Sequence, residues 1–458
     1  MQTTATSSLR VIDSHPGAQR SARPSPFRRQ HFYAAVGVIV CCLAVAILPF
    51  GPKKYGDLEF HAEAKNVALA LKGVNTEPVT IIRAPGPVLF YVIPYLFVPA
   101  GAPDNSYWNA AVAWTIVCMA VAVFCIQGAV RRLYGGVAEG VAIVLALLTP
   151  FWAYYSFGVN GEGPAFLGDA LFLYGWARWR TAARWRALDL VASWLGLVLF
   201  LLTKPSAIGL AGLAIAAAIV MWWRKDRKQA MFAVSCAVVM GCASMASSAA
   251  LKHFERPDYR PAQLLYFRWT AFLGSRQMRS EPWDWRFWDD TTRAGSRDYA
   301  DFVHDLATVR EEAVRTRYSV FDLEWRWVLN DFEHHPLVRA KMALVRALFM
   351  HVNLVNSVDP DRFHLGPLKG RAAYIAFHVA INLFYFVLVG SSLVFLFTRR
   401  SDFFSYWLLW GPWLALLAFH AIVYAEARYL FPVQPGLLVM ASAMLAPRLQ
   451  RLWPRLAC

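Results

Sequence analysis

The sequence has 458 residues, of which 57% are hydrophobic and only 17% are charged, whereas a soluble domain carries roughly 25% charged residues. The apolar residues gather in runs long enough to cross a bilayer, which takes about 20 residues per helix. These figures exclude a soluble globular protein and predict an all-α integral membrane protein. The net charge of +16 lies mostly in short connectors and in the two tails, which is typical of the positive-inside rule, so nucleic-acid binding is excluded.

The N-terminal part of the chain is expected to hold a tail and a first membrane span. Residues 1–30 are polar and lack hydrophobic periodicity, which predicts a disordered cytoplasmic tail. No small-residue cleavage site ends the apolar run 32–50, so we interpret this run as a retained span rather than a signal peptide. It begins an N-terminal membrane region over 31–250, whose first outer loop is 51–105.

The first outer loop is expected to contain two short helices. Residues 59–72 favour a helix that ends at Gly73, because glycine readily takes the conformation that terminates a helix. The Pro-Gly-Pro sequence at 85–87 is interpreted as a break. Residues 88–99 are apolar but too few to span, so they predict a helix lying in the membrane interface.

Basic connectors between the later apolar runs set the direction of each span. The connectors at 131–132 and 224–228 are strongly basic and are placed on the cytoplasmic side. Residues 154–161 and the loop around Lys204 then fall on the outer side. The runs expected to span are 108–127, 137–150, 162–177, 188–203, 206–223 and 229–250.

The large outer segment is expected over 251–370, where tryptophans alternate with charged residues. Its apolar run 336–355 is interrupted by Arg339, Lys341 and Arg346, and charges near the centre of a membrane helix are costly. We therefore expect an amphipathic helix on the outer surface at 337–355.

The C-terminal membrane region, 371–458, adds three spans to those above. They are expected at 372–397, 403–421 and 430–447. The total is about ten spans, with both termini on the cytoplasmic side of a bacterial-type inner (plasma) membrane.

Two carboxylates at the start of the first outer loop are candidates for catalysis. Asp57 and Glu59 follow the first span directly, so they lie at a membrane edge. Group transfer to a hydroxyl or amine needs a base on the acceptor and in some enzymes a metal, and either acid suits both roles. A divalent metal ion at these two residues is therefore left open. The alternative is that they are solvated loop acids or the N-cap of the following helix.

Four further residues could bind a lipid-borne phosphate on the same side. Arg83 precedes a proline in the first outer loop, and a guanidinium matches phosphate oxygens with several donors. Lys204 lies between two spans, and Arg428 and Tyr429 precede the last span. Snorkelling side chains or interfacial anchors are the alternative for all four.

Three more acids lie at or near the outer ends of spans. Glu426 precedes the Arg-Tyr pair, and Glu162 is seven residues before Asp169, on the same side of a helix. An ionisable residue inside a span is rare and usually functional, which singles out Asp169. For Glu162 and Glu426 we leave open a role toward an acceptor or a structural role. Packing of the Glu162–Asp169 face against Lys204 is an equally good structural explanation.

The combination of these motifs resembles the multi-spanning glycosyltransferases of the GT-C type, in particular the branch of the protein O-mannosyltransferases and the lipid A aminoarabinose transferase. Each motif is short, and the resemblance depends on their order and spacing across most of the membrane region. The motifs are Asp57-x-Glu59 followed by His61-Ala62-Glu63, Arg83-x-Pro85 leading to Phe90-Tyr91, Leu202-Thr203-Lys204-Pro205-Ser206, and Glu426-x-Arg428-Tyr429-x-x-Pro432.

The resemblance implies Asp57 as the catalytic carboxylate with Glu59 as its partner. It also implies that Arg83 holds the lipid phosphate, with assistance from Arg428 and Tyr429. The donor would be a monosaccharide on a polyprenyl phosphate, and the acceptor a lipid, a glycan or a protein. Such enzymes often have adjacent acids, whereas Leu58 separates them here, so which acid is the base stays open.

The residues themselves favour the same donor class. A transfer on the outer side cannot draw on cytoplasmic nucleotide sugars, and the chain has no glycine loop that would cradle a nucleotide phosphate. Two other functions remain as alternatives. A transporter or flippase would need repeated halves and paired charges within the membrane. A non-catalytic scaffold for envelope assembly would not need Asp57 or Arg83.

Overall fold

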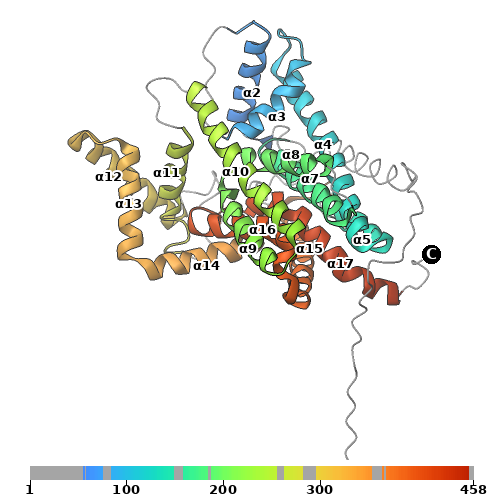
Figure 1. Cartoon of the computed structure of the whole chain (residues 1–458). Coiled ribbons are helices and arrows are strands. Elements are labelled where there is room, and N and C mark those ends of the chain that lie inside the picture. The colour runs from blue at the N-terminus through green and yellow to red at the C-terminus, as the bar shows by residue number, and fades with distance from the viewer. Residues whose placement is uncertain are drawn as a thin grey trace, which may run out of the picture.

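The structure is a computed structural model, and it describes residues 55–56, 58–75, 84–148, 158–183, 187–254, 262–281, 295–352, 364–365, 368–425 and 427–452. The predicted tail 1–30 and the predicted first span 32–50 lie outside the described residues. The described part of the chain is helical, and its strands are only two residues long (Figure 1). The prediction of a helical membrane fold is confirmed.

The first half of the chain forms a layer of packed helices below a pair of helices at the top of Figure 1. That pair is α2 and α3. The helices are α2 (Leu58–Leu71), α3 (Pro85–Leu96), α4 (Asp104–Tyr134), α5 (Gly136–Leu148), α7 (Glu162–Thr181), α8 (Ala187–Thr203), α9 (Gly209–Trp223) and α10 (Arg227–Phe254), with the 3₁₀ turn η1 (Pro205–Ile208). Strands β1 (Tyr55–Gly56) and β2 (Gly158–Val159) pair in parallel.

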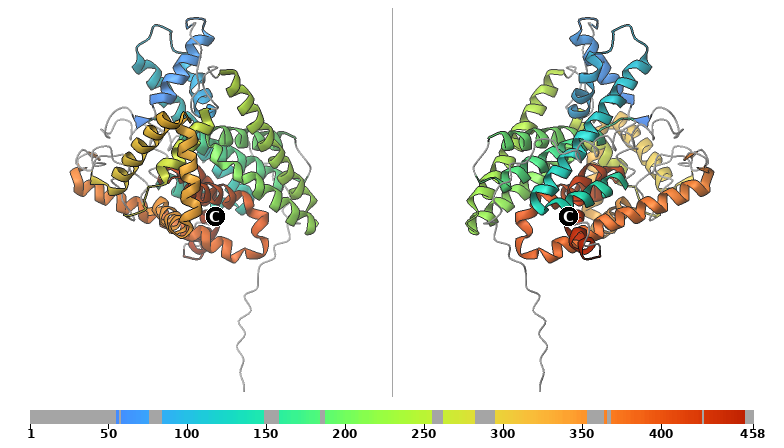
Figure 2. Two further views of the ribbon diagram at one scale, coloured as in Figure 1. Left: turned by 90° about the vertical axis from the view of Figure 1, so that its left-hand side faces the viewer. Right: turned by 90° about the vertical axis from the view of Figure 1, so that its right-hand side faces the viewer.

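The second half contains an arm that projects from one side and three helices that return to the body (Figures 1 and 2). We call α11–α14 the arm. The helices are α11 (Ala262–Gly274), α12 (Arg297–Thr316), α13 (Val320–His334), α14 (Pro336–Val352), α15 (Gly370–Thr398), α16 (Trp407–Ile422) and α17 (Gln434–Leu452). Between them lie β3 (His364–Leu365), β4 (Leu368–Lys369), η5 (Arg400–Tyr406) and η6 (Ala427–Val433).

Five described helical segments are long and apolar enough to cross a membrane. They are Asp104–Tyr134, Pro205–Trp223, Arg227–Ala249, Arg400–Ile422 and Tyr429–Leu452. Shorter apolar helices include α3, α5, α8 and the second half of α15. The expected total of ten spans therefore stays a prediction.

The start of α3 corrects one interpretation made from the sequence. Pro85 and Pro87 do not break the chain. They occupy the first turn of α3, where the missing N–H of proline costs nothing because those groups have no partner within the helix. The other helix of this loop is confirmed: α2 ends at Leu71, and Gly73 follows with φ +71°.

Helix α14 forms where the amphipathic helix was expected, but the charges point the other way. Arg339 and Arg346 are 5% and 1% exposed, so neither contributes to a solvent-facing polar side of the helix, and its place on the outer membrane surface stays a prediction. The exposed large side chains of this helix are Leu337, Leu344 and Leu348. The helix therefore presents an apolar face outward and turns its two arginines into the protein.

Arg346 can be buried because it binds backbone carbonyls at the ends of two helices. One of its terminal nitrogens donates to the oxygens of Ala421, Ile422 and Val423 at the end of α16. The other donates to Gly274 and Gln277 at the end of α11. The last carbonyls of a helix have no partner within it and carry partial negative charge. One guanidinium thus joins the arm to the body.

Helices α7 and α8 approach closely because glycines face each other. A Cβ at Gly168 would lie 2.7 Å from the backbone nitrogen of Phe200, and one at Gly196 would lie 2.5 Å from that of Phe172. Small residues at such positions let two membrane helices pack backbone to backbone. This packing fixes the start of α7 against the end of α8.

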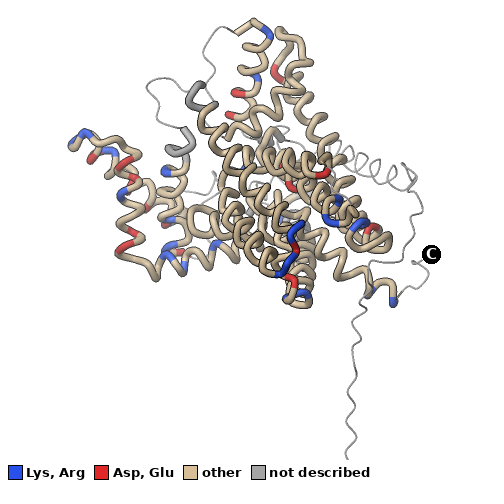
Figure 3. Tube along the Cα trace, in the orientation of Figure 1, with Lys and Arg blue, Asp and Glu red and all other residues tan. Residues whose placement is uncertain are grey.

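Helix α7 of the body has charged contacts at both of its ends. At one end, Arg178 pairs with Asp189 at 2.6 Å, and Arg180 donates to the carbonyl oxygen of Ser405. Figure 3 shows charged residues at the ends of the body helices and along the arm, with long uncharged stretches between. The opposite end of α7 begins at Glu162. That end carries the candidate site.

Candidate functional site

The structure describes only some of the residues predicted to form a site. Asp57, Arg83 and Glu426 lie outside the described residues. The backbone of Arg428 belongs to η6. Glu59 lies exposed in the first turn of α2.

Glu162 and Lys204 form a buried ion pair. The Nζ atom of Lys204 lies 3.0 Å from Oε1 of Glu162, and the two side chains are 12% and 4% exposed. Glu162 is the first residue of α7 and Lys204 directly follows α8, so the glycine contacts between these helices bring the charges together. This contact agrees with the structural explanation that the Glu162–Asp169 face packs against Lys204, as far as Glu162 is concerned.

Tyr429 joins this pair from a third segment. The ammonium of Lys204 lies 5.0 Å from the centroid of the Tyr429 ring, within the range of a cation–π contact. The Tyr429 ring stacks on the His420 ring, with centroids 4.1 Å apart and planes 29° apart. Three predicted residues, Glu162, Lys204 and Tyr429, therefore meet at one place.

His420 has a defined tautomer in this cluster. Its Nδ1 lies 3.1 Å from the carbonyl oxygen of Tyr424, which can only accept, so Nδ1 carries the proton. Its Nε2 lies 3.2 Å from Oγ of Ser206 and accepts the hydroxyl proton. The ring is oriented by contacts at both nitrogens. The sequence named Ser206 only as part of the motif around Lys204 and gave His420 no role, although a histidine inside the apolar run 403–421 is the kind of ionisable residue that signals a site.

The position of Glu162 is fixed by Asn160 and Tyr91. The Oδ1 atom of Asn160 accepts from the backbone N–H groups of Glu162 (3.0 Å) and Gly163 (3.1 Å), which caps the start of α7. The hydroxyl of Tyr91 donates to the carbonyl of Asn160 at 3.1 Å and accepts from its N–H at 3.2 Å. Tyr91, from the motif after Arg83, therefore holds Asn160, which lies between β2 and α7 and caps the helix that begins at Glu162.

Two backbone contacts bring the first outer loop to the same place. Tyr55 and Gly56 pair with Gly158 and Val159, directly before Asn160. Helix α3 begins two residues after Arg83, and its Gly86 packs on Thr203: a Cβ there would lie 2.6 Å from the Thr203 nitrogen. The described residues next to Asp57 and to Arg83 thus contact the segments that carry Glu162 and Lys204.

The motif after Asp57 has a structural role in part. Nδ1 of His61 lies 2.7 Å from the Tyr95 hydroxyl, and Nε2 lies 3.1 Å from Oδ1 of Asp104. Lys65 donates to the same Asp104 oxygen at 2.9 Å. These bonds fasten α2 to α3 and α4, and so hold the helix that follows Asp57.

Asp169 does not meet Lys204. It is 1% exposed and lies near the backbone of Gly436, in the first turn of α17. Neither of its carboxylate oxygens has a hydrogen-bond partner among the described residues. Asp169 is therefore a buried acid between α7 and α17 whose oxygens are not satisfied by the described part of the chain.

Metal binding has no candidate among the residues that the structure describes. In that part of the chain, no three His, Cys, Asp or Glu side chains are grouped as metal ligands. A metal at Asp57 and Glu59 stays a prediction, because Asp57 is not described.

The arrangement can bind an oxyanion. Lys204 offers N–H donors beside the Tyr429 ring, and Glu162 supplies the partner that a buried cation needs. The cluster is built from α7, the loop after α8, the end of α16 and η6, which are far apart in the chain.

No protein-family model and no curated protein sequence matches the chain. Among solved structures, it is similar to ArnT from Cupriavidus metallidurans in the apo state, with 16% identity, a TM-score of 0.36, and coverage of 93% of this chain and 81% of that one. ArnT bound to undecaprenyl phosphate gives 16% identity and a TM-score of 0.37, with 92% and 80% covered.

A third similar structure is the oligosaccharyltransferase from Archaeoglobus fulgidus, tethered with an acceptor peptide containing the NVT sequon. It gives 14% identity and a TM-score of 0.37, with 89% of this chain and 55% of that one covered. These proteins are of the GT-C class that the motifs resemble. Identities of 14–16% with TM-scores of 0.36–0.37 do not assign a function to this chain.

Proposed function

We propose that the protein is a membrane glycosyltransferase that moves a sugar from a polyprenyl-phosphate-linked donor to a lipid, glycan or protein acceptor at the outer face of the membrane. In this reaction an acceptor O–H or N–H group attacks the anomeric carbon. The bond between that carbon and the phosphate oxygen breaks, and the lipid phosphate leaves with the electron pair. The acceptor proton passes to a carboxylate, for which Asp57 is the proposed base and Glu59 its partner.

The observation that carries the proposal is the Lys204–Glu162 pair over Tyr429. A leaving phosphate gains negative charge as the glycosidic bond breaks, and a fixed cation in a dry site lowers the energy of that state. The side chain of Lys204 is 12% exposed and lies at the ends of apolar helices. We propose that Lys204 binds the donor phosphate, with Tyr429, Arg428 and Arg83 around it.

The neighbouring residues suit this role. The contact with Glu162 holds the amine of Lys204 in place before the donor arrives. Tyr429 and His420 form a rigid wall, because Ser206 and the Tyr424 carbonyl orient the imidazole. Such preorganisation costs nothing at the moment of reaction.

The test is a transfer assay with purified full-length protein and a panel of radiolabelled polyprenyl-phosphate sugars, with and without a chelator. Lys204→Met should lower the rate by about 100-fold or more, the usual loss when one preorganised charge or donor is removed. Lys341→Met, at an exposed position of α14, is the matched control and should transfer at the wild-type rate. No transfer from any lipid-linked sugar would overturn the proposal.

The two loop residues are tested in the same assay. Asp57→Asn should abolish transfer while the protein still accumulates in the membrane, because an amide cannot take the acceptor proton. Arg83→Ala should raise the apparent KM for the donor. Wild-type transfer by Asp57→Asn would remove it as the base, and an unchanged donor KM would remove Arg83 from the phosphate site.

A further inference from the structure

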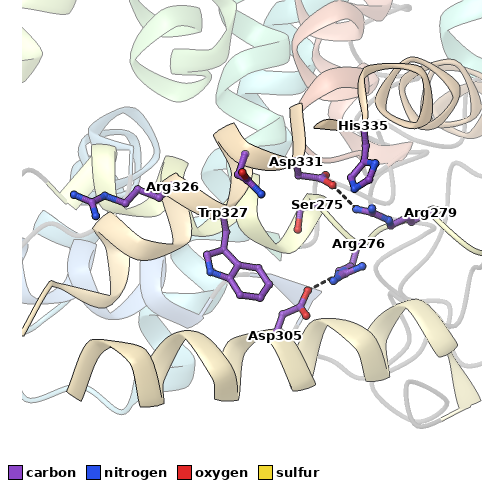
Figure 4. A pocket seen from close by; sticks show the side chains of 9 residues that line it. Ser275, Arg276, Arg279, Asp305, Arg326, Trp327, Asp331 and His335 are labelled. Carbon is purple, nitrogen blue, oxygen red and sulfur yellow. Dashed lines mark hydrogen bonds and ion pairs between the residues drawn. The ribbon is translucent and has the colours of Figure 1, made fainter. Parts of the chain in front are cut away.

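The arm contains a cavity separate from the Lys204 cluster. It has a volume of about 440 Å³, within the range of roughly 300–1,000 Å³ usual for small-ligand pockets. Its walls come from the turn after α11 and from α12 and α13 (Figure 4). The lining residues that matter here are Arg276, Arg279, Trp327, His335, Asp305 and Asp331.

Three arginines and two aspartates line this cavity. Arg276 pairs with Asp305, and Arg279 pairs with Asp331 at 2.7 Å. Asp331 is shared, since Arg339 of α14 also lies 2.5 Å from it. Three guanidinium groups therefore surround two carboxylates, and His335 lies beside them in Figure 4.

Two of the three lining arginines, Arg276 and Arg279, keep donors for a ligand. Their side chains are 23% and 20% exposed, for Arg276 and Arg279 respectively. Each ion pair engages one nitrogen of a group that carries five N–H donors. A planar array of donors is suited to carboxylate and phosphate oxygens.

The remaining lining is typical of sugar recognition. Trp327 forms one wall of the cavity (Figure 4), and an indole face packs on the apolar face of a sugar ring. Asn330 and the two aspartates offer acceptors, and Asn330 also offers donors, for hydroxyl groups around such a ring. Oxyanion binding and a stacking wall are thus present in one cavity.

The cavity is physically connected to the Lys204 cluster. Its edge residue Ser275 belongs to the turn that Arg346 holds through the carbonyls of Gly274 and Gln277. The Gln277 amide also binds the backbone of Ala425 in both directions, at 2.7 and 3.1 Å. Ala425 lies between Tyr424 and η6, so the turn contacts the loop that positions Tyr429.

We propose that this cavity binds a sugar residue bearing an oxyanion, a carboxylate or a phosphate, as a second contact with the glycan acceptor. The inference rests on the proposed function only in that it calls the bound sugar part of an acceptor. Binding of this sugar does not depend on transfer. Arg276 and Arg279 hold the oxyanion, Trp327 stacks on the ring, and the reacting atoms lie elsewhere, at the Lys204 cluster.

The test is isothermal titration calorimetry on the purified full-length protein in detergent. The probes are glucuronate, glucose 6-phosphate, glucose and inorganic phosphate. We expect saturable binding of one of the two charged sugars. Glucose should bind at least about tenfold more weakly, since a charge-assisted hydrogen bond contributes roughly that factor. Inorganic phosphate should also bind more weakly, because it has no ring to stack on Trp327. The better of the two charged sugars identifies the oxyanion.

Variants locate the binding. Arg279→Gln should weaken binding by about tenfold or more, and Arg279→Lys should recover only part of it, because lysine keeps the charge but not the fork. Arg315→Gln, at an exposed position of α12, should change nothing. Thermal melting of each variant controls for misfolding.

The outcomes separate the two proposals. Binding that survives Lys204→Met, in a protein that no longer transfers, supports both. No binding of either charged sugar, with wild-type transfer intact, overturns the inference alone. Equal binding of inorganic phosphate and sugar phosphate overturns the role of Trp327, and binding only to phosphatidic acid vesicles overturns the glycan in favour of a lipid headgroup.

Discussion

The helical body and the arm both bury charged side chains, but they satisfy them differently. At the candidate site, the body pairs one lysine with one glutamate, Lys204 with Glu162, against aromatic rings. The arm builds a network in which Asp331 serves both Arg279 and Arg339. A buried ion pair is costly to keep, so its presence in the body points to function, whereas in the arm one carboxylate is shared between two arginines.

The largest expected effect on stability comes from Arg346, where the two regions meet. Arg346→Ala should lower the free energy of unfolding by about 3 kcal/mol or more, because it leaves carbonyls at the ends of α11 and α16 buried without donors. Thermal unfolding in detergent measures this. Lys341→Ala, exposed on the same helix, is the control. A variant as stable as wild type would mean that the arm does not depend on this contact.

The second effect distinguishes pairing from function in the body. Glu162→Gln or Lys204→Met alone should each cost about 3 kcal/mol, because the partner charge stays buried. The double variant should recover most of that stability, since no charge is then left unpaired. A double-mutant cycle on the unfolding temperature gives the coupling. Additive costs would contradict a direct pair.

The third effect tests how the body brings its site together. Gly196→Ala places a Cβ against the backbone of α7 and should cost about 1–3 kcal/mol, the usual range for overpacking. Gly212→Ala in α9 has nothing within 4 Å of the new Cβ and should be neutral or stabilising. The KM for the lipid-linked sugar donor should rise for Gly196→Ala but not for Gly212→Ala. Equal stability of the two variants would contradict close α7–α8 packing.

The smallest effect is a pH dependence within the arm. Glu324 of α13 is 1% exposed, and burial raises its pKa to about 7, with Arg310 opposing the shift. Between about pH 4.5 and 7 the unfolded chain loses this proton while the folded arm keeps it, so stability falls as pH rises and is constant above.

The matched variant for this effect is Glu324→Gln. It should unfold at a higher temperature than wild type at pH 8 and at a similar temperature at pH 4, with a difference of about 1–2 kcal/mol at the higher pH. Melting curves across that range measure it. Parallel pH profiles for the two proteins would show that Glu324 does not titrate as described.

The sequence predicted the helical elements well because apolar runs, caps and connectors are local signals. Helix α2 and its stop before Gly73, α8, and the helix at 337–355 all form close to the expected limits. The direction of the α14 arginines could not be predicted, because it depends on carbonyls from α11 and α16.

The candidate site was only partly predictable for the same reason. Glu162, Lys204 and Tyr429 were singled out one by one, but their meeting depends on glycine contacts between α7 and α8 and on the fold of η6. His420 and Ser206 gave weak signals within apolar sequence. The cavity in the arm is lined by residues of α12, of α13 and of the turn after α11. Because these residues are far apart in the sequence, no local sequence pattern indicates the cavity.

The most direct test of the central claim is transfer by the double variant Glu162→Gln with Lys204→Met. This protein should fold nearly as well as wild type, because no buried charge is left unpaired. Its rate of sugar transfer from the best polyprenyl-phosphate donor should nevertheless be about 100-fold lower than that of the wild type, or below the detection limit. Transfer at the wild-type rate by this folded variant would contradict the assignment of Lys204 to the donor phosphate.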